Sequence, residues 1–173
     1  MAGQPVSESS ETTVPIQRVT VRSDRPFDDV VAAVYAGLGR TDDFAGLNRQ
    51  SLAARDRDEF DAVIEPVAGS SGLIEFLSLD LGGVLAIRDP DRSRRMLRII
   101  AGNPVTMSKM TATVPDAGSY APVTILVAER DAGVTLSYDR VAGAIAPYAG
   151  QEASSVAEAL DDAVLTLLRD AAG

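Results

Sequence analysis

The stretch from Arg95 to Thr106 combines residue types that bind anions. We predict a helix that carries Arg95 and Arg98 in its last turns, and their spacing of three would place both guanidinium groups on one side. Gly102-Asn103-Pro104 would end this helix and open another, with Asn103 as the N-cap. The first amides of the second helix, including that of Thr106, would form a positive pole. A carboxylate or phosphate group could lie between this pole and the arginines.

A second group of polar residues surrounds the end of a predicted hairpin. Tyr120 lies in the loop before the hairpin, where binding residues are common. Tyr138 shares a strand face with apolar residues, so we expect its ring in the core and its hydroxyl at the rim. Asp139 and Arg140 would flank the sheet end. These residues could contact a ligand or only hold the hairpin in place, and Asn103 could likewise be an ordinary cap. Both interpretations stay open.

The composition excludes several kinds of chemistry. The 173 residues include no Cys and no His, which removes zinc and iron–sulfur sites and the Ser-His-Asp and Cys-His mechanisms. Paired aspartates such as Asp161 and Asp162 are interpreted as solvated helix residues, because no calcium-loop spacing is present. We predict no catalytic residue, no metal and no cofactor. The net charge of −9 argues against nucleic acid or an anionic membrane as partner.

The chain is expected to form one α+β domain from residue 15 to residue 173, preceded by a flexible polar tail over residues 1–14. The start lacks a basic and an apolar region, and no run of about 18 apolar residues follows, so the expected compartment is the cytoplasm. The predicted strands cover residues 16–22, the two arms of a hairpin within 72–88, 122–129 and 134–138. The predicted helices cover residues 27–38, 58–68, 93–101, 105–114, 141–146 and 151–171.

Several of these predictions depend on short local signals. Asp24 is a candidate N-cap for the first helix. Residues 40–57 are interpreted as a loop with one helical turn. Gly82 and Gly83 favour a tight turn between two strands. The apolar residues of RRMLRII are assigned to a helix, with Met96 among those facing inward.

Three motifs in a fixed order resemble the domain-of-unknown-function family 302. They are Gly102-Asn103-Pro104, Tyr120-Ala121-Pro122-Val123-Thr124 and Ser137-Tyr138-Asp139-Arg140, and the resemblance covers about residues 60–140. It implies a small α+β fold with helices packed on an antiparallel sheet, often as a homodimer. It implies no catalytic residue.

Three functions remain as alternatives. The first is a homodimeric module that binds or senses a small anionic ligand. The second is an enzyme that uses Tyr, Asp or Arg, which the lack of Cys, His and any catalytic motif disfavours. The third is a structural or protein-interaction domain. The residues predicted to contact a ligand are Arg95, Arg98, Asn103, Thr106, Tyr120, Tyr138 and Arg140.

Overall fold

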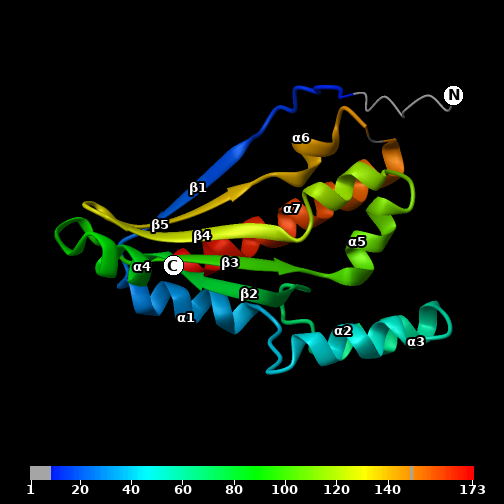
Figure 1. The fold of residues 1–173 in the computed structure, drawn as a ribbon, viewed down its shortest axis with the longest axis horizontal. Helices are drawn as coiled ribbons and strands as arrows, with labels where there is room; N and C mark the ends of the chain where they lie inside the picture. Colours follow the sequence, from blue (N-terminus) through cyan, green and yellow to red (C-terminus); the bar gives the residue numbers. More distant parts are fainter. Residues whose placement is uncertain (1–8, 149) are drawn as a thin grey trace, which may run out of the picture.

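Five antiparallel strands form one sheet in the part of the chain that the structure describes (Figure 1). The structure is a computed structural model that describes residues 9–148 and 150–173, so residues 1–8 of the predicted tail lie outside it. The strand order is β1-β5-β4-β3-β2, and β1 is an edge strand as predicted. The strands are β1 (Arg18–Ser23), β2 (Ile74–Asp80), β3 (Met96–Gly102), β4 (Val123–Arg130) and β5 (Gly133–Asp139).

Helices cover one face of this sheet. The first and last helices, α1 and α7, pack against each other and against the strands, and α7 runs behind the sheet in Figure 1. The helices are α1 (Phe27–Gly37), α2 (Phe44–Leu52), α3 (Arg57–Ile64), α4 (Leu81–Arg88), α5 (Pro104–Thr111), α6 (Val141–Ile145) and α7 (Gln151–Ala172). Short 3-10 turns are η1 (Glu65–Val67), η2 (Pro90–Arg92) and η3 (Pro115–Ser119). The predicted α+β class is confirmed.

The main core lies between the sheet and α1 with α7. Alternate residues of β4 and β5 are buried there, as their period-two pattern predicts; examples are Ile125, Val127 and Leu136. The predicted hairpin of β4 and β5 is confirmed. Its turn ends at Gly133, which has a φ of +103° and where a Cβ would come within 2.6 Å of the Ser23 carbonyl oxygen.

The predicted hairpin at Gly82 and Gly83 is wrong. Only its first arm is a strand, β2, which ends at Asp80, and the side chain of Asp80 accepts a hydrogen bond from the amide of Gly83 at 2.8 Å. That bond caps α4, so the two glycines begin a helix instead of a turn. A Cβ at Gly82 would come within 2.7 Å of the Arg94 carbonyl oxygen, so glycine lets α4 pack against the chain that leads into β3.

The predicted helix over RRMLRII is also wrong, because Met96–Gly102 is the strand β3. This strand bonds to β2 on one side and β4 on the other. A short apolar run fits a buried strand and a buried helix equally well by pattern alone. The two neighbouring strands decide between them.

Two local predictions near the N-terminus need correction. Asp24 does not cap α1, whose N-cap position is Pro26 and has no side-chain cap. Residues 40–57 contain a full helix, α2, which is capped by Asp43 through a bond from the amide of Gly46 at 2.7 Å. Together with α3, this helix encloses a second small core beside β2, where the rings of Phe44 and Phe76 lie 4.4 Å apart.

Within residues 9–148 and 150–173, none of the helices has the length and the apolar character needed to cross a membrane.

Candidate functional site

Tyr138 lies in the core with its hydroxyl buried, so the predicted position of this group at the rim is wrong. The hydroxyl donates a hydrogen bond of 2.5 Å to Asp161 of α7. Burial, and secondly this bond, raises the pKa of the Tyr138 hydroxyl above the ordinary range of a phenol. The same carboxylate accepts bonds from the amides of Val141 at 2.8 Å and Ala142 at 3.2 Å.

Asp161 was expected to be a solvated helix residue, and it is instead 0% exposed. Its three hydrogen bonds join α7 to β5 and to the first turn of α6. The sequence carries a signal for this burial, because Asp161 follows Ala157 by four and precedes Val164 by three, on the buried stripe of α7. Asp161 therefore positions three elements and presents no oxygen to a ligand.

Arg95 and Arg98 do not converge. Residues three apart in extended chain point to opposite sides, so the single-sided arrangement predicted from a helix is wrong. Arg95 forms an ion pair with Asp28 of α1, with its guanidinium 4.4 Å above the ring of Phe27. The hydrogen bond from Arg95 is the main cause that lowers the pKa of Asp28. Arg98 lies on the other face of the sheet and donates a bond of 3.3 Å to Thr124.

Asn103 is the N-cap of α5, as predicted. Its Oδ1 accepts bonds from the amides of Val105 at 2.8 Å and Thr106 at 3.4 Å, and its Nδ2 donates to the Gly72 carbonyl at 2.8 Å. The next amide, that of Met107, bonds to the Asn103 carbonyl at 2.9 Å. The amides at this helix start are therefore already satisfied within the chain.

A small apolar cavity lies beside this helix start. Asn103 and Thr106 line it together with apolar side chains such as Met107, Met110 and Phe76. Its volume of about 30 Å³ has room for one or two water molecules and no metabolite.

The sheet face opposite α1 and α7 is mostly open, and we call it the open face. In the strand register, one residue from each strand lines up across this face. From β2 to β1 these residues are Leu79, Arg98, Leu126, Ser137 and Thr20. Arg98 lies between Leu79 and Leu126 in this row, and the end of the row toward β1 is polar, with Ser137 and Thr20.

A shallow hollow of about 470 Å³ occupies the open face, and three arginines line it, Arg18, Arg98 and Arg130. Arg18 donates two bonds of 2.7 Å to Asp139. This pairing holds the pKa of the Asp139 carboxyl below its usual range, chiefly through the side-chain hydrogen bond. The guanidinium of Arg130 donates a bond of 3.3 Å to the hydroxyl of Thr135.

Neither Arg98 nor Arg130 has a carboxylate partner among the residues that the structure describes. The hydroxyls of Thr124 and Ser137 also line this hollow. The hollow is therefore positive and rich in hydrogen-bonding groups, although the whole chain carries a net charge of −9.

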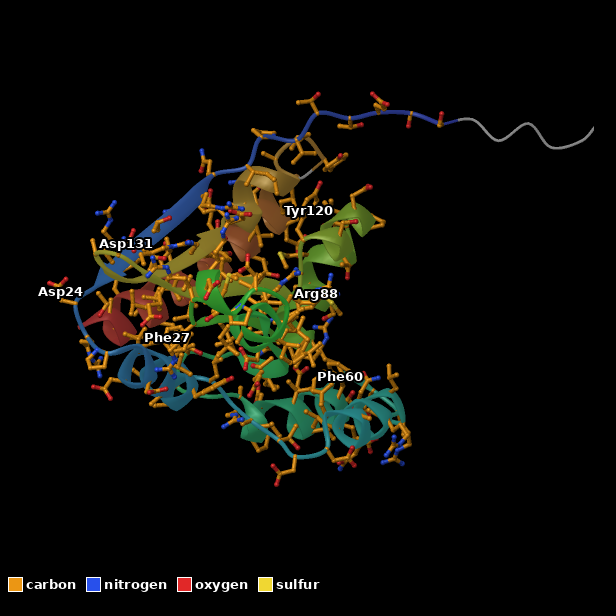
Figure 2. All side chains as sticks on the ribbon, turned by 60° about the vertical axis from the view of Figure 1, so that its left-hand side comes forward. Asp24, Phe27, Phe60, Arg88, Tyr120 and Asp131 are labelled. Atoms are coloured by element: carbon orange, nitrogen blue, oxygen red, sulfur yellow. The ribbon has the colours of Figure 1, made fainter. Side chains whose placement is uncertain are left out.

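A second, smaller hollow of about 180 Å³ adjoins the first and contains Tyr120 and Arg140. The two hollows share Thr124 and Asp139 among their lining residues. Tyr120 precedes β4 and Asp131 follows it, so the two labels mark the ends of that strand in Figure 2.

The seven predicted ligand residues thus lie in several different places. Arg98 lines the open-face hollow and Tyr120 and Arg140 line its neighbour. Tyr138 also borders the open-face hollow, although it is 1% exposed and its hydroxyl is buried in the core. The other three belong to an ion pair and a helix start. Sequence reasoning missed Arg18 and Arg130 as candidates. Strand alternation is the signal that could have found this site. If Met96–Gly102 is taken as a strand, alternation places Arg98 on the same face of the sheet as Arg130.

Among residues 9–148 and 150–173, no three acidic side chains come together as a metal ion would require.

These features define an α+β domain whose antiparallel sheet is covered by helices on one face. The profile of the family described as "Domain of unknown function DUF302" matches residues 48–168, and the chain belongs to this family. The match includes most of α7, beyond the region that the three motifs covered.

A solved structure agrees with this assignment. The crystal structure of an uncharacterized conserved DUF302 protein from Bacillus stearothermophilus is similar to this chain, with a TM-score of 0.62 and 10% sequence identity. The similarity covers 89% of this chain and 97% of that one, and at this identity it shows a common fold. The search of curated proteins found no match.

Proposed function

We propose that the protein is a non-enzymatic module that binds a small anionic ligand on the open face of its sheet. The observation that carries this proposal is the pair of arginines, Arg98 and Arg130, which share one hollow and lack carboxylate partners among the described residues. Guanidinium groups bind carboxylates and phosphates through two parallel hydrogen bonds, which favours a planar or tetrahedral oxyanion here.

The open face suits an anion better than the start of α5 does. The amides at that helix start already bond to Asn103, and Arg95 is occupied by Asp28. In the open-face hollow, the hydroxyls of Thr124 and Ser137 add neutral hydrogen-bond donors beside the arginines. The hollow of about 470 Å³ also falls within the common range for ligand sites, roughly 300–1,000 Å³.

The geometry favours binding over catalysis. Proton transfer requires a group whose pKa lies near the working pH. The Tyr138 hydroxyl has its pKa raised, and its proton is held by Asp161. Asp139 has its pKa lowered and is held by Arg18. Neither group is placed to act as an acid or base near neutral pH.

Thermal unfolding in the presence of phosphate, sulfate, succinate and citrate at low ionic strength tests this proposal. We expect at least one anion to raise the melting temperature, because a ligand that binds only the folded chain stabilises it. Replacing Arg98 and Arg130 by Ala should remove the shift, since a charged hydrogen bond contributes about 1.5–3 kcal/mol, or roughly tenfold or more in affinity.

The matched control is Arg57→Ala, which removes an exposed arginine of α3 away from the sheet. This variant should keep the full shift. The proposal is wrong if no anion stabilises the protein, or if the double variant responds like the control.

A further inference from the structure

The open face divides into a positive polar half and an apolar half. Toward β1 it carries hydroxyls and arginines, whereas toward β2 it carries aliphatic side chains. In the register, Arg98 has Leu79 on one side and Leu126 on the other, and Ile100 pairs with Leu77 two positions further along β3. Any anion bound at Arg98 therefore lies directly beside aliphatic surface.

This aliphatic surface is exposed to an unusual extent. Six large apolar side chains are exposed within the described residues, and four of them come from the short segment of β2 and α4. Leu77 and Leu79 lie on the open face in register with Ile100 and Arg98, and their exposed fractions are 49% and 37%. Leu77 and Leu79 are two residues apart on one face, and exposed apolar residues that lie together mark binding surfaces more often than scattered ones do.

We infer that the ligand is an alkyl carboxylate: a carboxylate head held by Arg98 and Arg130 and an unbranched apolar chain lying along Leu77 and Leu79. This inference rests on the proposed function and names the class of its ligand. Neighbouring strands are about 4.8 Å apart, so a chain of eight to ten carbons spans the distance from β3 across β2. The head meets the unpaired positive charge, and the chain covers the exposed leucines.

Charge argues against a second copy of this chain, and against a lipid bilayer, as the occupant of the open face. In a symmetric dimer the same patch meets itself, so two open faces in contact would bring together two patches that each carry Arg98 and Arg130. Like charges in contact oppose association. A bilayer with anionic lipids would repel a chain of net charge −9. A single small amphiphile avoids both problems.

Calorimetric titration of the full chain with acetate, hexanoate and decanoate, each below its micelle concentration, tests the inference. Each buried methylene should raise the affinity about three- to fourfold, so decanoate should bind at least a hundredfold more tightly than acetate. Decyltrimethylammonium, which has the same chain and the opposite charge, should not bind. The double variant Leu77→Thr with Leu79→Thr should lose the dependence on chain length, and Leu52→Thr, an exposed control on α2, should keep it.

The outcomes separate this inference from the proposed function. If acetate and decanoate bind equally, the alkyl carboxylate is wrong and the anion site stands. If the cationic amphiphile binds as well as decanoate, only the alkyl chain is recognised, so the inference is wrong and the anion site depends on the thermal shifts with the simple anions. If no anion binds at all, both are wrong. If native mass spectrometry shows a dimer that Leu77→Thr with Leu79→Thr dissociates, the aliphatic surface is a contact between copies and the inference is overturned.

Discussion

A single carboxylate, Asp161, connects three elements of this domain. It is buried and accepts hydrogen bonds from the Tyr138 hydroxyl and from the amides of Val141 and Ala142. A buried charge is costly unless it is fully hydrogen-bonded, and here three donors converge on it. No buried side-chain polar atom lacks a partner among the described residues. Asp161 is therefore a structural centre, and its neighbour Asp162 is exposed on the same helix.

Asp161→Ala should destabilise the protein by about 3–5 kcal/mol, because it leaves a buried hydroxyl and two amides without their acceptor. Urea unfolding followed by circular dichroism measures the change. Asp162→Ala removes the adjacent exposed carboxylate and should shift the unfolding free energy by less than about 0.5 kcal/mol. Equal effects of the two variants would contradict the structural role of Asp161.

The raised pKa of Tyr138 predicts that the free energy of unfolding decreases at alkaline pH. Its pKa is raised in the folded chain relative to the ordinary value of about 10, so the folded protein holds the phenol proton more tightly than the unfolded protein does. The resulting stability is complete below about pH 10 and falls as the pH rises further. Unfolding measured between pH 8 and 11.5 should show this decline.

Tyr138→Phe should be less stable than the parent at pH 8, by about 1–3 kcal/mol, since Asp161 loses one donor. Its stability should then fall less steeply above pH 10. The matched variant Tyr35→Phe removes a hydroxyl that bonds to Ser78 and leaves Tyr138 in place, so it should keep the steep decline. A Tyr138→Phe curve parallel to that of the parent would refute this assignment.

At the scale of the elements, Asn103 holds the start of α5 against the loop before β2. Its Oδ1 caps the helix, and its Nδ2 bonds to the Gly72 carbonyl. One residue thus fixes both the helix and the chain that enters β2. Asn103 therefore has a structural role in the motif Gly102-Asn103-Pro104 without any bound ligand.

Asn103→Ala should cost about 1–2 kcal/mol of unfolding free energy, because it removes the cap and the bond to Gly72 together. Asn103→Ser keeps an acceptor for the helix amides and loses only the donor to Gly72, so it should cost less. Chemical denaturation of both variants separates the two contributions. Asn103→Ser as damaging as Asn103→Ala would show that the cap contributes little.

At the scale of the whole molecule, the two faces of the sheet differ in kind. One face packs on α1 and α7 and forms the main core, whereas the other exposes arginines, hydroxyls and aliphatic residues. The homodimer implied by the family resemblance stays a prediction. Arg98 and Arg130, which have no carboxylate partner among the described residues, disfavour a dimer in which two open faces meet.

We therefore expect sedimentation velocity to show a two-chain species whose stability does not depend on the open face. Arg98→Glu changes the charge at the centre of that face and should leave the dimer unchanged. A monomer at all concentrations would refute the homodimer. A dimer strengthened or broken by Arg98→Glu would show that the open face itself is the contact between copies.

The sequence by itself determined the elements with strong local signals. The cap at Asn103 marks the start of α5, alternating residues and Gly133 define the β4–β5 hairpin, and a continuous apolar stripe defines α7. Each of these signals acts within a few residues of chain. The three family motifs are also only a few residues long, so the sequence alone is enough to recognise them.

Only the tertiary structure decided the segment from β2 to β3 and, with it, the candidate site. The run Met96–Gly102 is apolar enough for a helix or a strand, and its pairing with β2 and β4 selects the strand. That choice places Arg95 and Arg98 on opposite faces and brings Arg98 into one hollow with Arg130. The spacing along α7 indicates that Asp161 is buried, but its hydrogen-bond partners on β5 and α6 are set by contacts that no local pattern contains. Long-range pairing and burial decided both, because each depends on residues far apart in the chain.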